Sequence, residues 1–283
     1  MDFRDENDFM AAVAAEVVDK RMLSATVVEH AAYLVTPHGL QTLGVIGGWV
    51  AFWTALCLLA CVVPRVGPSR AGFAVSATHA VSTFSIATAL LVRRRGYIPF
   101  YASLDAYPVD TALCAASLGY FLYDMYWVLT KNRAFLAHHL ICIVDFSSLL
   151  LVIRCCSTHG SANLFVAELG GLAFQAARLY PSPASRAAFH VAFVATRAGL
   201  WPVYLGMMSR AFLAEPTCGW VCALLSVGGE TVLWLINVVW LCQTVFGVDI
   251  LWRLGLTRSM KAKAPPSVPV REVPKPKPLA ATQ

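Results

Sequence analysis

Apolar runs of about 20 residues recur along this chain, and each is long enough to cross a lipid bilayer as a helix. Proline, glycine or clustered basic residues separate one run from the next. A segment inside lipid must satisfy its backbone hydrogen bonds internally, which leaves helices or a closed barrel, and the alternation of period two that a barrel needs is missing. The sequence therefore predicts an all-α integral membrane protein with about seven transmembrane helices. They are expected near 43–63, 72–92, 109–129, 137–153, 160–180, 187–208 and 217–247.

The composition agrees with a chain that is dissolved in lipid. Of its 283 residues, 58% are hydrophobic and 13% are charged, whereas a soluble domain is about 45–50% apolar and about 25% charged. Aromatic and basic residues do not interleave as they do in a nucleic-acid groove. Membrane lipids are therefore the expected partners, and nucleic acid is not. Self-association and binding to other membrane proteins stay open.

The two ends of the chain differ from the apolar middle. Residues 1–42 form an acidic, amphipathic region, with seven of the 16 acidic residues in the first 29 positions. Residues 259–283 contain six of the 15 prolines and little apolar content, which predicts a disordered basic tail. If this tail is cytoplasmic, the cytoplasmic side of the membrane has 13 basic residues and the other side has eight. The positive-inside rule expects such a bias. Seven spans then put the amino-terminal region on the opposite side.

The cysteines give no sign of a metal or redox centre. The chain has nine of them and no CxxC pair, so zinc sites and thioredoxin-like chemistry are not supported. No metal and no cofactor are predicted. Cys155, Cys156 and Cys218 lie near loops on one predicted side of the membrane, and a disulfide among them stays open.

Polar and ionisable residues inside the predicted helices carry the functional signal. Each costs roughly 2.5–3.5 kcal/mol at membrane depth and usually faces the interior of a bundle. Here they fall on one face of six successive helices, because they recur at helical spacing, and this predicts a shared polar interior. The stripes contain His79; Tyr120, Tyr123, Asp124 and Trp127; His138, Cys142 and Asp145; Glu168, Gln175 and Arg178; His190, Arg197, Trp201 and Tyr204; and Glu230, Trp234 and Asn237.

Several of these residues have a structural interpretation beside the functional one. Glu168 with Arg178 or Arg197 fits a buried ion pair that only holds the bundle together. Trp201 fits packing as well as ligand contact. The adjacent pair His138 and His139 differs, because two imidazoles at the start of a helix suit proton transfer or nucleophilic attack.

The polar motifs also resemble a known family. The stretch GYFLYD at 119–124, followed by His138 and His139, is similar to the TLC domain, where a GYF-x-YD turn of helix precedes a paired histidine. Further matches follow in the same order along roughly 70–250. They are SATHA at 76–80 for S-x-x-HA, Glu168 for an acidic position, Arg178 for the arginine of N-x-R, Arg197 for that of F-x-x-x-R, and LINVVW at 235–240 for LN-x-x-W.

The resemblance implies six helices over 70–250 around a lipid-sized cavity, with 43–63 as an extra helix. The family includes ceramide synthases, which acylate a sphingoid base from acyl-CoA with the histidine pair, and members that influence membrane lipid composition. The synthase motif continues through a second His-Asp and a further Asp. Here residues 158–163 read THGSAN, without either aspartate, so the chain resembles the non-synthase branch more closely.

Two functional hypotheses follow from this resemblance. The first is a protein of the endoplasmic reticulum that binds or senses lipid in lipid homeostasis, with eight candidate ligand contacts. The second is an N-acyltransferase with acyl-CoA as co-substrate, in which Asp124 or Asp145 holds His138 or His139, and helical periodicity favours His138. A transporter or channel fits less well, because the polar residues gather in one half of the membrane. The ligand contacts are Tyr120, Tyr123, His79, Glu168, Arg178, Arg197, Trp201 and Asn237.

Overall fold

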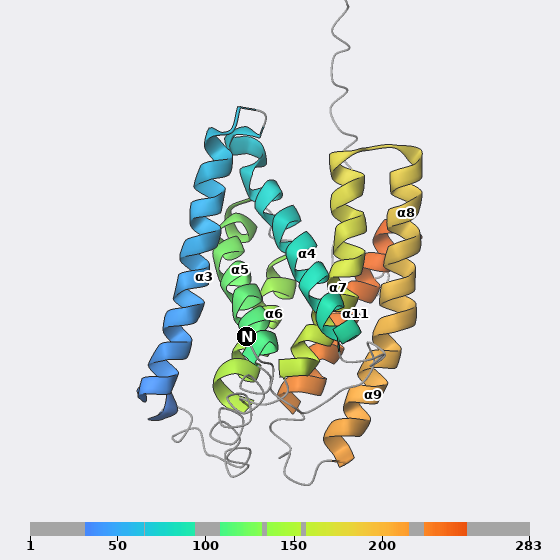
Figure 1. The fold of residues 1–283 in the computed structure, drawn as a ribbon. Coiled ribbons are helices and arrows are strands. Elements are labelled where there is room, and N and C mark those ends of the chain that lie inside the picture. Colours follow the sequence, from blue (N-terminus) through green and yellow to red (C-terminus); the bar gives the residue numbers. More distant parts are fainter. Residues whose placement is uncertain are drawn as a thin grey trace, which may run out of the picture.

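The computed structural model describes residues 32–64, 66–93, 108–131, 135–153, 157–214 and 224–247, and every element in these ranges is helical (Figure 1). The elements form seven rods. They are α3 (Pro37–Val62), α4 (Gly67–Arg93), α5 (Pro108–Lys131), α6 (Leu136–Ser147) with η3 (Ser148–Ile153), α7 (Ser157–Leu179), α8 (Pro183–Val194) with η4 (Ala195–Leu200) and α9 (Trp201–Ala214), and η5 (Leu224–Gly228) with α11 (Gly229–Thr244).

Five of the rods are long and apolar enough to cross a membrane. The chain is therefore an all-α integral membrane protein. The rod that begins with α6 is apolar but shorter, spanning Leu136–Leu151. Helix α7 is long but less apolar, because it contains polar residues that face the interior. Large apolar side chains such as Leu58 and Leu59, which are 64% and 63% exposed, cover the outside of the bundle, where lipid tails take the place of a protein core.

The first rod begins earlier than the sequence pattern predicts. It starts at Pro37, with Thr36 as its N-cap, so residues 37–42 belong to this helix and not to the amino-terminal region. A threonine followed by proline is a common helix start, because proline fits the first helical position. Residues 1–31 and the predicted tail at 259–283 lie outside the described residues, as do Cys155, Cys156 and Cys218.

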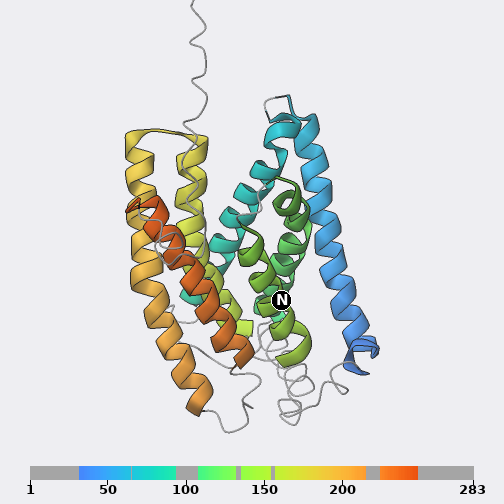
Figure 2. The same ribbon diagram turned by 180° about the vertical axis from the view of Figure 1, so that it is seen from behind.

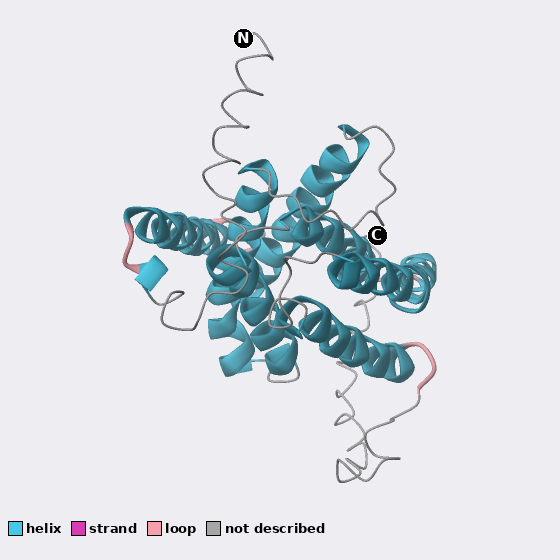
Figure 3. Cartoon of the chain, turned by 90° about the horizontal axis from the view of Figure 1, so that it is seen from below, coloured by secondary structure: helices cyan, strands magenta, loops and turns pink. Residues whose placement is uncertain are grey.

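The rods form two groups that α4 connects. Helices α3, α5 and α6 lie on one side and α7, the α8–α9 rod and α11 on the other, while α4 crosses between them and contacts both α3 and α7 (Figures 1 and 2). Viewed from below, helices and short loops account for everything described, without a strand (Figure 3). Successive rods run antiparallel, so the α3–α4 turn and the α7–α8 turn lie at the same end, the upper end in Figure 1.

The predicted extra helix α3 is part of the packed bundle. The Trp53 indole donates a hydrogen bond to the Ala116 carbonyl, at 3.0 Å, and its ring lies 5.6 Å from that of His79. Gly119 permits this close packing, because a Cβ at this position would lie 2.5 Å from the Cβ of Trp49. The glycine of the GYFLYD motif thus has a packing role.

Candidate functional site

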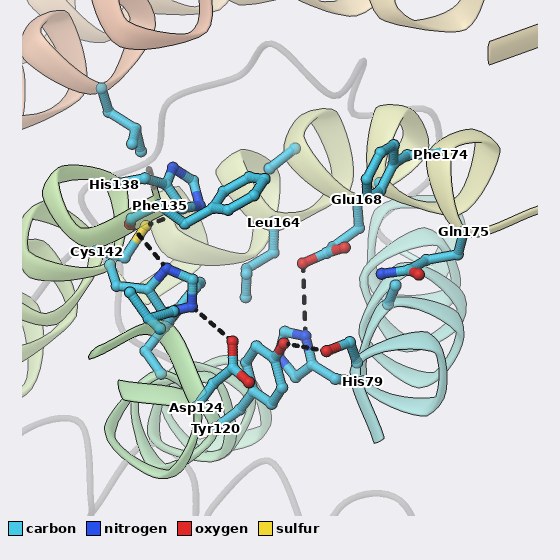
Figure 4. Close-up of a pocket in the computed structure, with 18 of the residues that line it drawn as sticks. His79, Tyr120, Asp124, Phe135, His138, Cys142, Leu164, Glu168, Phe174 and Gln175 are labelled. Atoms are coloured by element: carbon cyan, nitrogen blue, oxygen red, sulfur yellow. Dashed lines mark hydrogen bonds and ion pairs between the residues drawn. The ribbon is translucent and has the colours of Figure 1, made fainter. Parts of the chain in front are cut away.

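The polar stripes of the sequence meet around one cavity of about 350 Å³ (Figure 4). It lies among α4, α5, α6, α7, η4, α11 and the first residue of α9. Ten of the twelve residues predicted as catalytic or ligand-binding line it. They are His79, Tyr120, Asp124, His138, His139, Asp145, Glu168, Arg178, Arg197 and Trp201.

The second histidine of the pair contacts a carboxylate. His139 Nε2 lies 2.8 Å from Asp124 Oδ2, and His139 Nδ1 lies 3.1 Å from the Phe135 carbonyl oxygen. Both ring nitrogens therefore face acceptors, although a neutral imidazole has only one N–H to donate. The arrangement brings an imidazole and a carboxyl group into contact beside the cavity, and both are common groups in general acid–base catalysis.

The first histidine lies in a different environment. His138 Nε2 is 3.7 Å from Cys142 Sγ, and its Nδ1 has no hydrogen-bond partner in the described part of the chain. Its ring lies 5.4 Å from the ring of Trp240. Both rings of the pair line the cavity, and His139 is the one that contacts Asp124, although helical periodicity favoured His138 as the functional ring. Helix α5 packs on the side of α6 that carries His139, whereas His138 faces α11.

A second imidazole and carboxylate lie on the opposite wall. His79 Nδ1 is 3.5 Å from Glu168 Oε1, and its Nε2 is 3.3 Å from Ser117 Oγ. The His79 ring stacks on Tyr120, with centroids 3.9 Å apart and planes 11° apart. The Tyr120 hydroxyl donates to Ser76 Oγ at 2.9 Å. These contacts fix the orientation of the ring.

The predicted ion pair between Glu168 and an arginine is not formed. Arg197 instead donates Nε–H to Asn237 Oδ1 at 2.8 Å and one N–H from each of its two terminal nitrogens to the carbonyls of Val166 and Ala167, at 3.2 and 3.1 Å. Gly170 leaves room for it, because a Cβ there would lie 3.3 Å from the guanidinium. All three nitrogens of Arg197 therefore donate to protein atoms.

Two predicted contacts do not line the cavity, and one lies at its edge. Asn237 lies behind Arg197. Tyr123 accepts a hydrogen bond from Trp127 Nε1 at 3.0 Å. Arg178, near the upper end of α7, is exposed and lies over the rings of Phe73 and Phe174, at 4.6 and 5.5 Å from their centroids.

Sequence reasoning placed Glu230 on a polar stripe but did not select Glu230 or Asn163 as a site residue. Asn163 lines the cavity and donates a hydrogen bond to Glu230, and both side chains are buried. Their signal was the presence of an amide and a carboxylate inside apolar runs, the same criterion that selected Glu168. His159, in the same stretch as Asn163, is bonded to Tyr204 and does not line the cavity.

Short π-helical turns lie close to these polar residues. Asp145 lies three residues before η3, Arg197 lies within η4, and Glu230 lies two residues after η5. A π-turn rotates the following residues on the helix and is frequent at functional sites. These turns place the buried polar side chains of three separate rods on the inside of the bundle.

The fold and site define an α-helical membrane protein with a polar cavity at its centre. Within the described residues, no group of three or more His, Cys, Asp or Glu side chains is arranged to hold a metal ion. No family model matches the chain, and no curated protein or solved structure is significantly similar to it. The likeness to the TLC domain thus rests on the sequence motifs.

Proposed function

We propose that this chain is a multi-pass membrane protein of the TLC type that binds lipid in its central cavity and influences membrane lipid composition from the endoplasmic reticulum. The observation that carries the proposal is the cavity itself. It lies inside a bundle of apolar helices, and ten of the residues selected by the sequence motifs and stripes line it. Its position inside the membrane makes bilayer lipids the most abundant molecules that can reach it.

The lining of the cavity is suited to an amphiphile. Apolar side chains such as Phe121, Phe146 and Leu164 alternate around it with His79, Glu168 and other polar groups. An entirely apolar chain would leave the polar groups unpaired, and a small ion would leave the apolar surface unused. A lipid supplies both kinds of contact. A volume of about 350 Å³ is at the low end for a ligand pocket and fits part of a lipid.

Mass spectrometry of the lipids that co-purify with the full-length chain tests this proposal. We expect one lipid class to be enriched over the host membrane. Leu164→Trp, which fills the cavity, should reduce that enrichment. Leu235→Trp is the matched control, because Leu235 lies on the same bundle but is 50% exposed on its outside. A lipid profile equal to the host membrane for the unmodified chain would contradict the proposal.

One observation also favours acyl transfer as a second candidate function. His139 contacts Asp124, while His138 Nδ1 has no hydrogen-bond partner among the described residues and lies beside the same cavity. In an amide-forming reaction, an amine attacks the thioester of acyl-CoA, its lost proton passes to a base, and the CoA thiolate receives a proton from an acid. His138 fits the base and the His139–Asp124 pair fits the acid. Incubating purified protein with acyl-CoA and a long-chain base and measuring new amide distinguishes a synthase from a binding protein.

We further propose that the carboxy-terminal tail is cytoplasmic, on the basis of its excess of basic residues. Gln283 and Met1 both lie outside the described residues, so single-cysteine labelling at these positions in sealed vesicles is the direct test. We expect the tail alone to react with a reagent that does not cross the membrane when vesicles expose their cytoplasmic face. Equal reactivity at both ends would contradict seven spans.

A further inference from the structure

Four buried polar side chains from four different rods gather at the inner end of the cavity. Asp145 comes from α6, Asn163 from α7, Trp201 from α9 and Glu230 from α11, and their exposed fractions are 2%, 4%, 0% and 0%. The first three line the cavity, and Glu230 lies directly behind them against Asn163. We call these four residues the cavity floor.

The floor has more hydrogen-bonding atoms than the protein satisfies. Asn163 Nδ2 donates to Glu230 Oε1. Asp145 Oδ1 and Asn163 Oδ1 have no hydrogen-bond partner among the described residues, and both side chains line the cavity. Glu230 interacts instead with Asp145, Trp201 and Asn163. A buried polar atom without a partner costs about 1–3 kcal/mol, and such atoms are rare in folded proteins. Both atoms are acceptors, so the missing partner is a donor.

The charge around the floor also restricts this partner. Asp145 and Glu230 are neighbouring carboxyl groups, and Glu168 and Asp124 lie further along the cavity. The guanidinium of Arg197 already donates to Asn237, Val166 and Ala167. Arg178 is the other arginine in the described lining, and it lies 15 residues from Asn163 along α7, about 22 Å away at the rise of a helix. An anionic group at the floor would therefore lie beside carboxyl groups, while the Arg197 guanidinium is held by Asn237 and two backbone carbonyls.

We propose that the cavity takes its lipid with the polar end inward, and that this end is a hydrogen-bond donor without negative charge, a hydroxyl or an ammonium group. A phosphate or carboxylate end group is excluded. This inference rests on the proposed function, since it names the chemical class of the lipid that the same cavity binds. The donor satisfies Asp145 Oδ1 and Asn163 Oδ1.

A series of single-chain amphiphiles with the same alkyl chain tests the inference on the full-length protein in a neutral detergent. Radiolabelled 1-tetradecanol is the probe, and tetradecylamine, myristate and tetradecyl phosphate are the competitors. We expect unlabelled tetradecanol and tetradecylamine to displace the probe, and myristate and tetradecyl phosphate to compete at least tenfold less well. The ratio of the concentrations of tetradecanol and tetradecylamine that displace half of the probe distinguishes a preference for a hydroxyl from a preference for an ammonium group. Equal competition by the anionic amphiphiles would overturn the inference.

Floor variants show whether the selectivity arises at these residues. Asp145→Asn and Glu230→Gln keep the shape of the side chain and remove its ionisable carboxyl group. We expect each variant to weaken the binding of tetradecylamine about tenfold, because a hydrogen bond to a charged group is worth about 1.4 kcal/mol more than a neutral one. Myristate should compete better in the same variants. Asp110→Asn is the matched control, since Asp110 is equally buried but does not line the cavity. Floor variants that behave like this control would overturn the assignment of the floor.

The outcomes separate this inference from the proposed function. If lipid co-purifies but the anionic amphiphiles compete as well as tetradecanol, lipid binding stands and the end-group selectivity fails. If no lipid co-purifies and tetradecanol does not bind saturably, both fail. The amphiphile series needs only the unmodified protein, so the inference is decided even if a floor variant does not fold.

Discussion

Arg197 and the cavity floor are both buried polar sites in the same bundle, yet the protein treats them differently. Arg197 donates to Asn237 and to two backbone carbonyls of α7, and its own carbonyl accepts from Trp234 Nε1 at 2.8 Å. In the floor, Asp145 Oδ1 and Asn163 Oδ1 have no hydrogen-bond partner in the described chain. A buried group whose partners all come from the protein stabilises the fold, whereas a group with open positions is available to a ligand. The two sites should therefore respond differently to substitution.

The histidine pair lies between these two extremes. His139 has partners at both nitrogens, and His138 has an open Nδ1. One ring is held in place while its neighbour keeps a free position at the cavity. Stability measurements combined with lipid measurements can show whether this division between fixed and open groups has functional meaning.

The largest expected effect is at Arg197. Arg197→Lys keeps the charge but cannot reach three acceptors with one ammonium group, so buried acceptors lose their donors. We expect a loss of about 3 kcal/mol in stability, in the range for breaking a buried charged interaction. Thermal unfolding in detergent, followed by tryptophan fluorescence, measures it. Arg186→Lys, at an exposed position on α8, is the control. Equal melting temperatures for the two variants would show that the Arg197 contacts do not hold the bundle together.

Glu168→Ala should have a smaller effect than the ion-pair interpretation predicted. Its carboxyl group contacts His79 directly and interacts with Arg197 only through space, without an ion pair, so its removal breaks one direct contact. We expect a loss of about 1–2 kcal/mol, the size of one hydrogen bond to a charged group. The same unfolding measurement applies. A loss as large as that of Arg197→Lys would restore the interpretation that Glu168 pairs with an arginine in the folded protein.

Substitution of the histidine pair should separate stability from function. We expect all three variants, His138→Ala, His139→Ala and Asp124→Asn, to be expressed but to fail to restore the lipid profile of a deletion strain. His138→Ala should keep the melting temperature, whereas His139→Ala and Asp124→Asn break a buried contact and should lower it modestly. His139→Ala and Asp124→Asn remove the same contact, so the double variant should be no worse than either single variant. Misfolding of all of these variants would make the pair structural. Wild-type lipid profiles from folded variants would place the function elsewhere.

The smallest effect is expected at Tyr123, a predicted ligand contact that does not line the cavity. Tyr123→Phe removes the acceptor for Trp127 Nε1, which should cost about 0.6 kcal/mol, the average for a hydrogen bond within membrane helices. Lipid binding should stay unchanged. Tyr126→Phe is the control, because Tyr126 is 65% exposed on the outside of the same helix. Reduced lipid co-purification for Tyr123→Phe alone would show that the ring contacts lipid after all.

Much of the fold and of the cavity lining could be predicted because both depend on local patterns. An apolar run of sufficient length becomes a helix in lipid, since no other conformation satisfies its backbone. Polar residues at helical spacing then face inward, and this placed His79, Asp124 and Glu168 at one cavity. The helix start at Pro37 is also a local feature, but a search for long apolar runs does not detect the N-cap that begins a helix. It shows the apolar content of a segment and not its first residue.

The sequence by itself determined that this chain is helical, that it belongs in a membrane and that its polar residues share an interior. Only the tertiary structure decided which polar group meets which. Periodicity gives the direction of a side chain around its own helix, but a contact also depends on the rotation and depth of the neighbouring helix. That is why Asp124 reaches His139 and not His138, why Arg197 bonds to backbone carbonyls instead of Glu168, and why Asn163 and Glu230 meet at the cavity floor.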